Sequence, residues 1–202
     1  MRTTDSYSDL RRLGQPVVTT RDAAARWHKD QQVAGRRLRA MEGSGLVRRL
    51  RRGVWALDSD VEPFVVAPYL TAPFPAYVSF WSALAEHGMI EQIPRHISVA
   101  STARTQRITT PIADYQIHHL TPELLTGFEG SASTGYVATP EKALFDAVYI
   151  RAAAGSKAYF PELSLPAGFD EAVLKDLTNR VKSKRLRTLV SRQLRTTVRQ
   201  AS

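Results

Sequence analysis

Residues 30–45 constrain the fold of this chain most, because their apolar and polar side chains alternate with the period of an α-helix. The apolar face of such a helix consists of Ala34, Leu38 and Met41. The opposite face consists of Gln32, Arg36 and Arg39. We therefore expect an amphipathic helix over residues 31–41 that packs by one face and exposes an amide and two guanidinium groups.

The flanking residues place this helix in a local pattern of three helices and a β-hairpin. The expected elements are helices over residues 8–13, 21–28 and 31–41 and strands over residues 46–50 and 54–57. Thr19 or Thr20 caps the second helix and Asp30 the third, because their side-chain oxygens can accept hydrogen bonds from first-turn N–H groups. A turn at residues 51–53 joins the strands. This order predicts a winged helix-turn-helix over residues 1–60.

The formal charge of the 202-residue chain is +9 at pH 7 and is unevenly distributed. Residues 1–60 hold 13 lysines and arginines against 7 acidic residues, and residues 151–202 hold 11 against 4. Residues 61–150 hold only 4 basic against 8 acidic residues. Clustered positive charge attracts polyanions, so we expect a nucleic acid to interact with the two ends of the chain. The alternative interpretation is charge that serves solubility alone.

The outer face of the helix over residues 31–41 has the chemistry of a base-reading surface. Glutamine can form two hydrogen bonds with adenine in the major groove, and arginine can form two with guanine. Gln31 and Gln32 lie at the helix N-terminus, the part that reaches bases in helix-turn-helix proteins. We predict that double-stranded DNA contacts Thr20, Arg21, Gln31, Gln32, Arg36, Arg39, Arg48, Arg49, Arg51 and Arg52. The alternative is an amphipathic surface helix with a solvated basic face.

Four of these arginines crowd the predicted β-turn, with almost no acidic residue nearby: Arg48, Arg49, Arg51 and Arg52. Like charges this close repel one another unless an anion is present. We therefore expect the hairpin to act as a wing on the phosphate backbone or in the minor groove. Neighbouring residues of a strand point to opposite faces, so only some of the four can contact DNA at once. Trp55 is expected to pack the hairpin onto the helices.

The rest of the sequence predicts a connector and a second domain, which makes the chain α+β. Residues 61–76 contain four prolines, and we interpret them as a Pro-rich connector, with a short edge strand over residues 64–67 as an option. Residues 77–202 are expected to form a mixed α/β domain with C-terminal helices. Its expected elements are helices that begin at Ser79, Thr139 and Asp170, a last helix over residues 186–194, and strands over residues 96–101, 115–120 and 135–138.

The chain lacks groups that exported and membrane proteins use. It contains no cysteine, which excludes disulfides and thiolate metal sites. The first residues are polar rather than apolar, and no run of about 18 apolar residues predicts a transmembrane helix. We therefore expect a cytoplasmic protein without membrane contact.

No catalytic or metal-binding pattern is evident among the polar residues. The five histidines are scattered, and the adjacent His118 and His119 would point to opposite faces of a strand. Asp114, Glu141 and Asp146 lack the arrangement of a nuclease cation site, and no phosphate-cradling glycine loop is present. We predict no metal, no cofactor and no enzymatic activity.

The C-terminal residues form a basic run that has two interpretations. Eight lysines and arginines lie between residues 180 and 199. They are either a solvated helical face or a second surface that contacts phosphates. Under the second interpretation, the candidate accessory DNA-binding residues are Lys182, Lys184, Arg185 and Arg187.

Two segments of the middle part resemble a known family. Residues 77–88 read Tyr-Val-Ser-Phe-Trp-Ser-Ala-Leu-Ala-Glu-His-Gly, and residues 135–146 read Gly-Tyr-Val-Ala-Thr-Pro-Glu-Lys-Ala-Leu-Phe-Asp. Together they resemble the AbiEi-type antitoxins of type IV (abortive infection) toxin–antitoxin systems, in which a helix-turn-helix also precedes these segments. The resemblance covers residues 10–150 and extends loosely to the end of the chain.

This resemblance implies a regulator with two activities. Its winged helix would bind inverted repeats of operator DNA in its own promoter and repress the operon, and its C-terminal domain would neutralise a nucleotidyltransferase-like toxin. Two alternatives from other classes stay open. One is a DNA-processing enzyme, such as a nuclease, that the winged helix delivers to its substrate. The other is a ligand-sensing repressor whose middle domain binds a small molecule.

Overall fold

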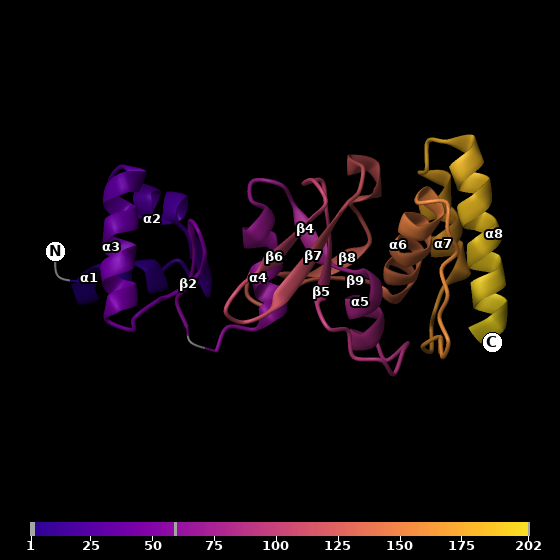
Figure 1. Ribbon diagram of the computed structural model, residues 1–202, viewed down its shortest axis with the longest axis horizontal. Helices are drawn as coiled ribbons and strands as arrows, with labels where there is room; N and C mark the ends of the chain where they lie inside the picture. Colours follow the sequence, from indigo (N-terminus) through magenta and orange to yellow (C-terminus); the bar gives the residue numbers. More distant parts are fainter. Residues whose placement is uncertain (1–2, 59, 202) are drawn as a thin grey trace.

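The structure, a computed structural model, describes residues 3–58 and 60–201 and has a mixed α+β fold. Figure 1 shows its elements in successive layers along the longest axis of the molecule. A small helical unit lies at the N-terminal end, a larger sheet lies in the middle, and α8 forms the C-terminal end. None of the described helices combines the length and apolar composition needed to cross a membrane.

The N-terminal unit consists of α1 (Thr3–Arg11), β1 (Val17–Thr19), α2 (Thr20–Trp27), α3 (Gln31–Gly43), β2 (Arg48–Arg51) and β3 (Val54–Ala56). Its strands form an antiparallel sheet in the order β1-β3-β2. The three predicted helices and the hairpin are confirmed, although α1 begins earlier and α3 ends later than expected. The sequence did not predict β1, because a three-residue strand is too short to show a period of two.

Capping interactions determine where α2 and α3 begin. The Thr19 hydroxyl accepts a hydrogen bond from the Asp22 backbone N–H at 3.1 Å, and the Asp22 carboxylate accepts one from the Thr19 N–H at 2.8 Å. This pair is a capping box. The Asp30 carboxylate accepts a hydrogen bond from the Val33 N–H at 2.8 Å. Thr19 and Asp30 were both among the expected caps.

The interior of this unit matches the amphipathic pattern of the sequence. The buried side chains on facing sides of α2 and α3 are Ala23, Ala24, Trp27, Ala34, Leu38 and Met41. Trp55 of β3 is also buried in this cluster, as expected for a residue that packs the hairpin onto the helices. The polar face of α3 is therefore directed outward.

The segment interpreted as a connector forms a helix instead. Residues 63–71 are α4 (Pro63–Thr71), so the expectations of a Pro-rich connector and of an edge strand over residues 64–67 are wrong there. Pro63 occupies the first turn, where its missing N–H costs no helical hydrogen bond. Pro68 removes one bond in the interior, and burial of the apolar side chains on several sides of α4 offsets this cost.

The larger sheet has six strands in the order β6-β7-β5-β4-β9-β8. They are β4 (Ala76–Val78), β5 (Ile97–Ser101), β6 (Gln106–Thr109), β7 (Asp114–His119), β8 (Phe128–Ser131) and β9 (Gly135–Ala138). The pairs β4–β9 and β5–β7 are parallel, and the other pairs are antiparallel. The three strands expected in this domain are confirmed as β5, β7 and β9.

Helices cover both faces of this sheet. In addition to α4, they are α5 (Phe80–Glu86), the short 3-10 helix η1 (Pro122–Leu124), α6 (Pro140–Ala153), α7 (Glu171–Asn179) and α8 (Lys184–Ala201). Helices α5 and α6 share one apolar core with α7 and α8. Helix α4 packs on the opposite face of the sheet. The last helix is longer than expected, since it continues to Ala201.

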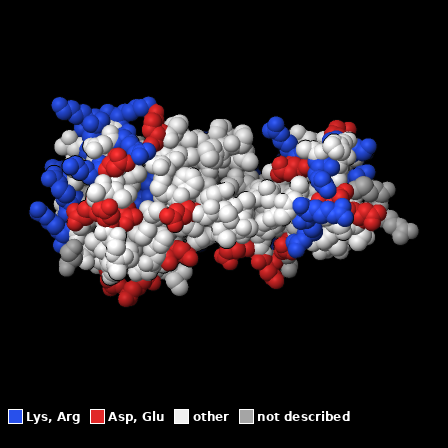
Figure 2. All heavy atoms as spheres, turned by 180° about the vertical axis from the view of Figure 1, so that it is seen from behind, with Lys and Arg blue, Asp and Glu red and all other residues white. Residues whose placement is uncertain are grey.

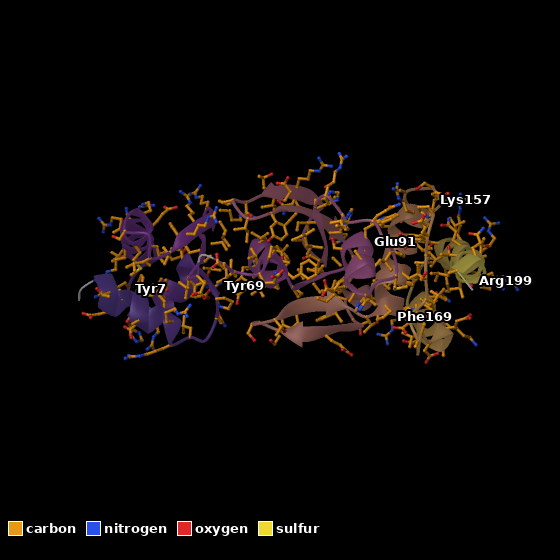
Figure 3. The ribbon with its side chains drawn as sticks, turned by 90° about the horizontal axis from the view of Figure 1, so that it is seen from below. Tyr7, Tyr69, Glu91, Lys157, Phe169 and Arg199 are labelled. Carbon is orange, nitrogen blue, oxygen red and sulfur yellow. The ribbon has the colours of Figure 1, made fainter. Side chains whose placement is uncertain are left out.

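Helix α4 joins the small unit to the larger sheet through one apolar core. This core contains Val17, Leu50, Val54 and Ala56 from the small sheet, Val65, Val66, Ala67 and Leu70 from α4, and Val99, Tyr115 and Ile117 from the larger sheet. In Figure 3, Tyr69 of α4 lies between the small unit, marked by Tyr7, and the larger sheet. The small unit is therefore docked on the body rather than tethered to it.

Candidate nucleic-acid interface

The outward face of α3 carries four polar side chains that were predicted to contact DNA. Gln31, Gln32, Arg36 and Arg39 are exposed, whereas Ala34 and Leu38 between them have no exposed surface. Within the part of the chain that the structure describes, no ion pair involves Arg36 or Arg39. These two guanidinium groups are therefore available to an external partner.

The start of α2 is fixed against the middle of α3 and against the hairpin. The Thr20 hydroxyl accepts a hydrogen bond from Trp55 Nε1 at 2.9 Å, and the Thr20 backbone N–H donates one to the Gly53 carbonyl at 2.8 Å. A Cβ atom at Gly35 would lie 3.7 Å from Thr20 Cγ2. Thr20 was predicted to contact DNA, but its side chain is half-buried and engaged in these contacts. Its neighbour Arg21 is exposed.

Two of the four hairpin arginines are directed toward the body of the molecule. Arg51 Nη1 donates a hydrogen bond to the carbonyl oxygen of Leu70 at 2.9 Å, near the C-terminus of α4. Arg48 Nη2 donates one to the carbonyl oxygen of Pro111 at 3.1 Å, in the turn between β6 and β7. The sequence suggested an uncompensated cluster of charge. Carbonyl oxygens compensate part of it, and the carbonyl of Leu70 lies at the C-terminal end of a helix, which is electrically negative.

The other two hairpin arginines remain candidates for DNA contact. Arg49 lies opposite Trp55 in the hairpin, with its guanidinium carbon 5.8 Å from the centre of the indole ring. Arg52 is exposed in the turn between β2 and β3. The structure thus places the α3 face, Arg21, Arg49 and Arg52 on one small unit, whereas Arg48 and Arg51 of the same unit donate hydrogen bonds to the body.

Basic side chains gather at both ends of the molecule. Figure 2 shows lysine and arginine over the N-terminal unit and over the C-terminal helices, with few between them. At the C-terminal end, Lys182 forms an ion pair with Glu123, and Arg187 Nε donates a hydrogen bond to the Val181 carbonyl at 2.9 Å. Of the four proposed accessory residues, Lys182, Lys184 and Arg185 are exposed, and Arg187 is half-buried.

A polar network lies buried beneath the larger sheet. Lys142 and Asp146, one turn apart on α6, form an ion pair with no exposed surface. Asp146 Oδ2 also accepts hydrogen bonds from the Ser79 hydroxyl at 2.7 Å and from the Tyr77 hydroxyl at 3.0 Å. Burial raises the pKa of the Asp146 carboxyl and lowers that of the Lys142 ammonium, while the attraction between them opposes both shifts. Ser79 was expected to cap α5, but its hydroxyl serves this network instead.

The three carboxylates considered for a nuclease cation site have different surroundings in the structure. Asp146 belongs to the buried network, Glu141 Oε1 accepts a hydrogen bond from the Asp170 N–H at 3.0 Å, and Asp114 is exposed on β7. Among residues 3–58 and 60–201, no three histidine, aspartate or glutamate side chains gather in a way that could hold a metal ion.

No protein-family model matches this chain, and no curated protein matches it.

Proposed function

We propose that the N-terminal unit is a winged helix-turn-helix and that the protein is a sequence-specific DNA-binding regulator. The observation that carries this proposal is the outward face of α3, where Gln32, Arg36 and Arg39 are exposed on a helix whose other face is buried. The hairpin that directly follows α3 supports the interpretation as a winged helix. Arginine and glutamine are the side chains best suited to guanine and adenine edges.

In the proposed mechanism, α3 enters the major groove of a duplex. Gln32, Arg36 and Arg39 form hydrogen bonds with base edges, and the capped N-terminus of α3 keeps Gln31 and Gln32 nearest to the bases. Arg21 and Arg52 contact phosphates on either side, which sets the register without reading sequence.

We further propose that the protein is an antitoxin that represses its own operon. The support is the resemblance to AbiEi-type antitoxins, together with the spatial proximity of the two segments that carry it. Ser79 of the first segment donates to Asp146 of the second, and His87 Nε2 lies 2.6 Å from the Ala138 carbonyl. Residues 77–88 and 135–146 therefore form one structural unit. The partners would be inverted repeats of operator DNA and a nucleotidyltransferase-like toxin.

A mobility-shift titration on the DNA upstream of the gene tests the DNA-binding proposal. We expect specific binding that weakens steeply with salt, because counterions are released from the phosphates. Arg36→Ala should weaken this binding, whereas Arg104→Ala, which removes an exposed arginine of the body, should not. Absence of binding at low salt would refute the proposal. Co-expression with the adjacent gene tests the antitoxin proposal, which fails if that gene does not inhibit growth or is not neutralised.

A further inference from the structure

An open groove of about 900 Å³ lies on the larger sheet, away from α4. Its floor is formed by β6 and β7, and its walls are formed by the start of α5 and the second half of α6. The loop between α5 and β5, marked by Glu91 in Figure 3, supplies residues 92–96 to its rim. In that rim, Ile93 is 92% exposed. The groove exists because α5 and α6 leave this end of the sheet uncovered.

The strand pattern explains why the floor of the groove is polar. Successive side chains of β7 point to opposite faces, and Tyr115 and Ile117 are buried against α4. Asp114, Gln116 and His118 therefore face the groove. On β6, Arg107 is paired with Gln116, and its Nε donates a hydrogen bond to Gln116 Oε1 at 2.9 Å.

Three arginines converge on this groove although the surrounding segment is acidic. Residues 61–150 contain only 4 basic residues, of which Lys142 is buried. Two of the remaining three, Arg95 and Arg107, line the groove, and Arg151 joins them from α6. The only carboxylate among the lining residues is Asp114. Within the described residues, none of the three arginines has an ion pair, so the groove has a net charge of two positive at neutral pH.

His118 lies at the end of the groove near α5. Its ring packs on Phe80, with the ring centres 4.6 Å apart. Burial, together with smaller effects of the nearby His96 and Arg151, lowers the pKa of His118 to about 4. The imidazole is therefore neutral at pH 7 and can both donate and accept a hydrogen bond. Phe80 has a φ of +56°, a strained conformation for an aromatic residue that is often found at ligand sites.

We propose that this groove binds a small phosphorylated ligand of the nucleotide class. A phosphate monoester carries about two negative charges at pH 7, which matches the net charge of the lining. Planar guanidinium groups bind phosphate oxygens through paired hydrogen bonds. The Gln92 and Gln116 amides and the apolar surface of Trp81 can hold the organic part, and the volume lies in the range of small-molecule sites.

Calorimetric titration of the full-length protein with adenosine, guanosine, cytidine and uridine monophosphates tests the proposal. We expect at least one of them to bind, and to bind at least about tenfold more tightly than its nucleoside or inorganic phosphate. Equal binding of inorganic phosphate would reduce the groove to a simple anion site and overturn the proposal. Binding of single-stranded oligonucleotides without any mononucleotide binding would also overturn it.

Variants locate the binding and separate this proposal from DNA binding. Arg107→Ala and Arg151→Ala should each weaken the nucleotide by about tenfold or more, because each removes a charged phosphate contact. Arg104→Ala, on an exposed arginine outside the groove lining, should leave nucleotide affinity unchanged. A bound phosphate should also raise the pKa of His118, which NMR titration of its imidazole detects. Unchanged nucleotide affinity in both groove variants would refute the assignment of the groove. The same two variants, without nucleotide, should bind the upstream DNA as the unmodified protein does, so that a failure of DNA binding can be told apart from a failure of nucleotide binding.

Discussion

The guanidinium group of Arg51 in the hairpin donates a hydrogen bond to the carbonyl oxygen of Leu70 in α4 at 2.9 Å. An arginine of the proposed DNA-binding unit thus fastens that unit to the body. The sequence alone favoured a phosphate contact for Arg51, and the structure favours a role in docking. Arg51 and Arg52 are adjacent in the chain, yet they are expected to affect different properties.

Arg51→Ala should lower stability more than DNA affinity. Its charged hydrogen bond to Leu70 is half-buried, and removing such a bond costs about 1–3 kcal/mol. Arg52→Ala should leave the free energy of unfolding nearly unchanged and weaken DNA binding with a smaller salt dependence. Urea denaturation and salt-dependent mobility shifts of both variants check this. If Arg51→Ala instead weakened DNA binding and left stability unchanged, Arg51 would be a DNA contact.

Arg36→Ala should reduce affinity for the specific operator by about 1–3 kcal/mol and relax preference at one base position. The side chain is exposed on the face of α3 opposite the fully buried Leu38, so its removal should not perturb the core. Binding assays on an operator library, with random DNA for comparison, measure both effects. Equal losses on operator and random DNA would show that Arg36 contacts only phosphates.

Lys142→Met should destabilise the fold by about 3–5 kcal/mol, because Asp146 would be left as an uncompensated charge in the interior. Asp146 has no exposed surface, and its other partners are the Ser79 and Tyr77 hydroxyls. As a control, Arg180→Ala removes an exposed ion pair with Asp176 and should cost at most about 1 kcal/mol. Similar losses of unfolding free energy in the two variants would show that burial does not make the Lys142–Asp146 pair more important than an exposed one.

Stability should fall as the pH decreases from about 6.5 to about 4, in part through His118. Its pKa is lowered to about 4 in the fold, so the unfolded chain, with a pKa of about 6.5, binds more protons in this window. His118→Gln should flatten this part of the profile. Urea denaturation across the window measures the slope for both proteins. An unchanged slope in the variant would show that His118 is not the responsible group.

Leu70→Ala should lower the free energy of unfolding by about 2–5 kcal/mol, the usual range for a buried leucine. Leu70 belongs to the core that α4 shares with the small sheet and the larger sheet. We therefore expect calorimetry to show one transition for the whole chain, shifted to lower temperature in the variant. Two separate transitions in the unmodified protein would mean that the shared core does not couple the units.

The N-terminal helices could be predicted because their signals are local. The Thr19 and Asp30 caps and the spacing of Ala34, Leu38 and Met41 each act over a few residues. Helix α4 could not be predicted in the same way, because two prolines obscured an apolar helix that packs on two sheets. The strands β4, β6 and β8 are too short to show a period of two, and β4 also pairs with strands that are distant in sequence.

The candidate site was predictable only in part. The outward face of α3 follows from helical periodicity. The partners of Arg48 and Arg51 are backbone carbonyls. Every residue has a carbonyl, so the sequence could not indicate which ones these arginines would contact. The groove on β6 and β7 escaped detection because its arginines are far apart in the chain.

Helix α4 shares one apolar core with the small sheet and with the larger sheet, and this packing restrains rotation of one against the other. A copy bound to DNA through α3 would therefore carry its body at a fixed angle to the duplex axis. Two copies on an inverted repeat could not swivel to accommodate a different separation of the half-sites. If the protein binds inverted repeats as proposed, the packing of α4 would limit the permitted spacing of the half-sites, although α4 lies in the core and not on the proposed DNA-contacting face.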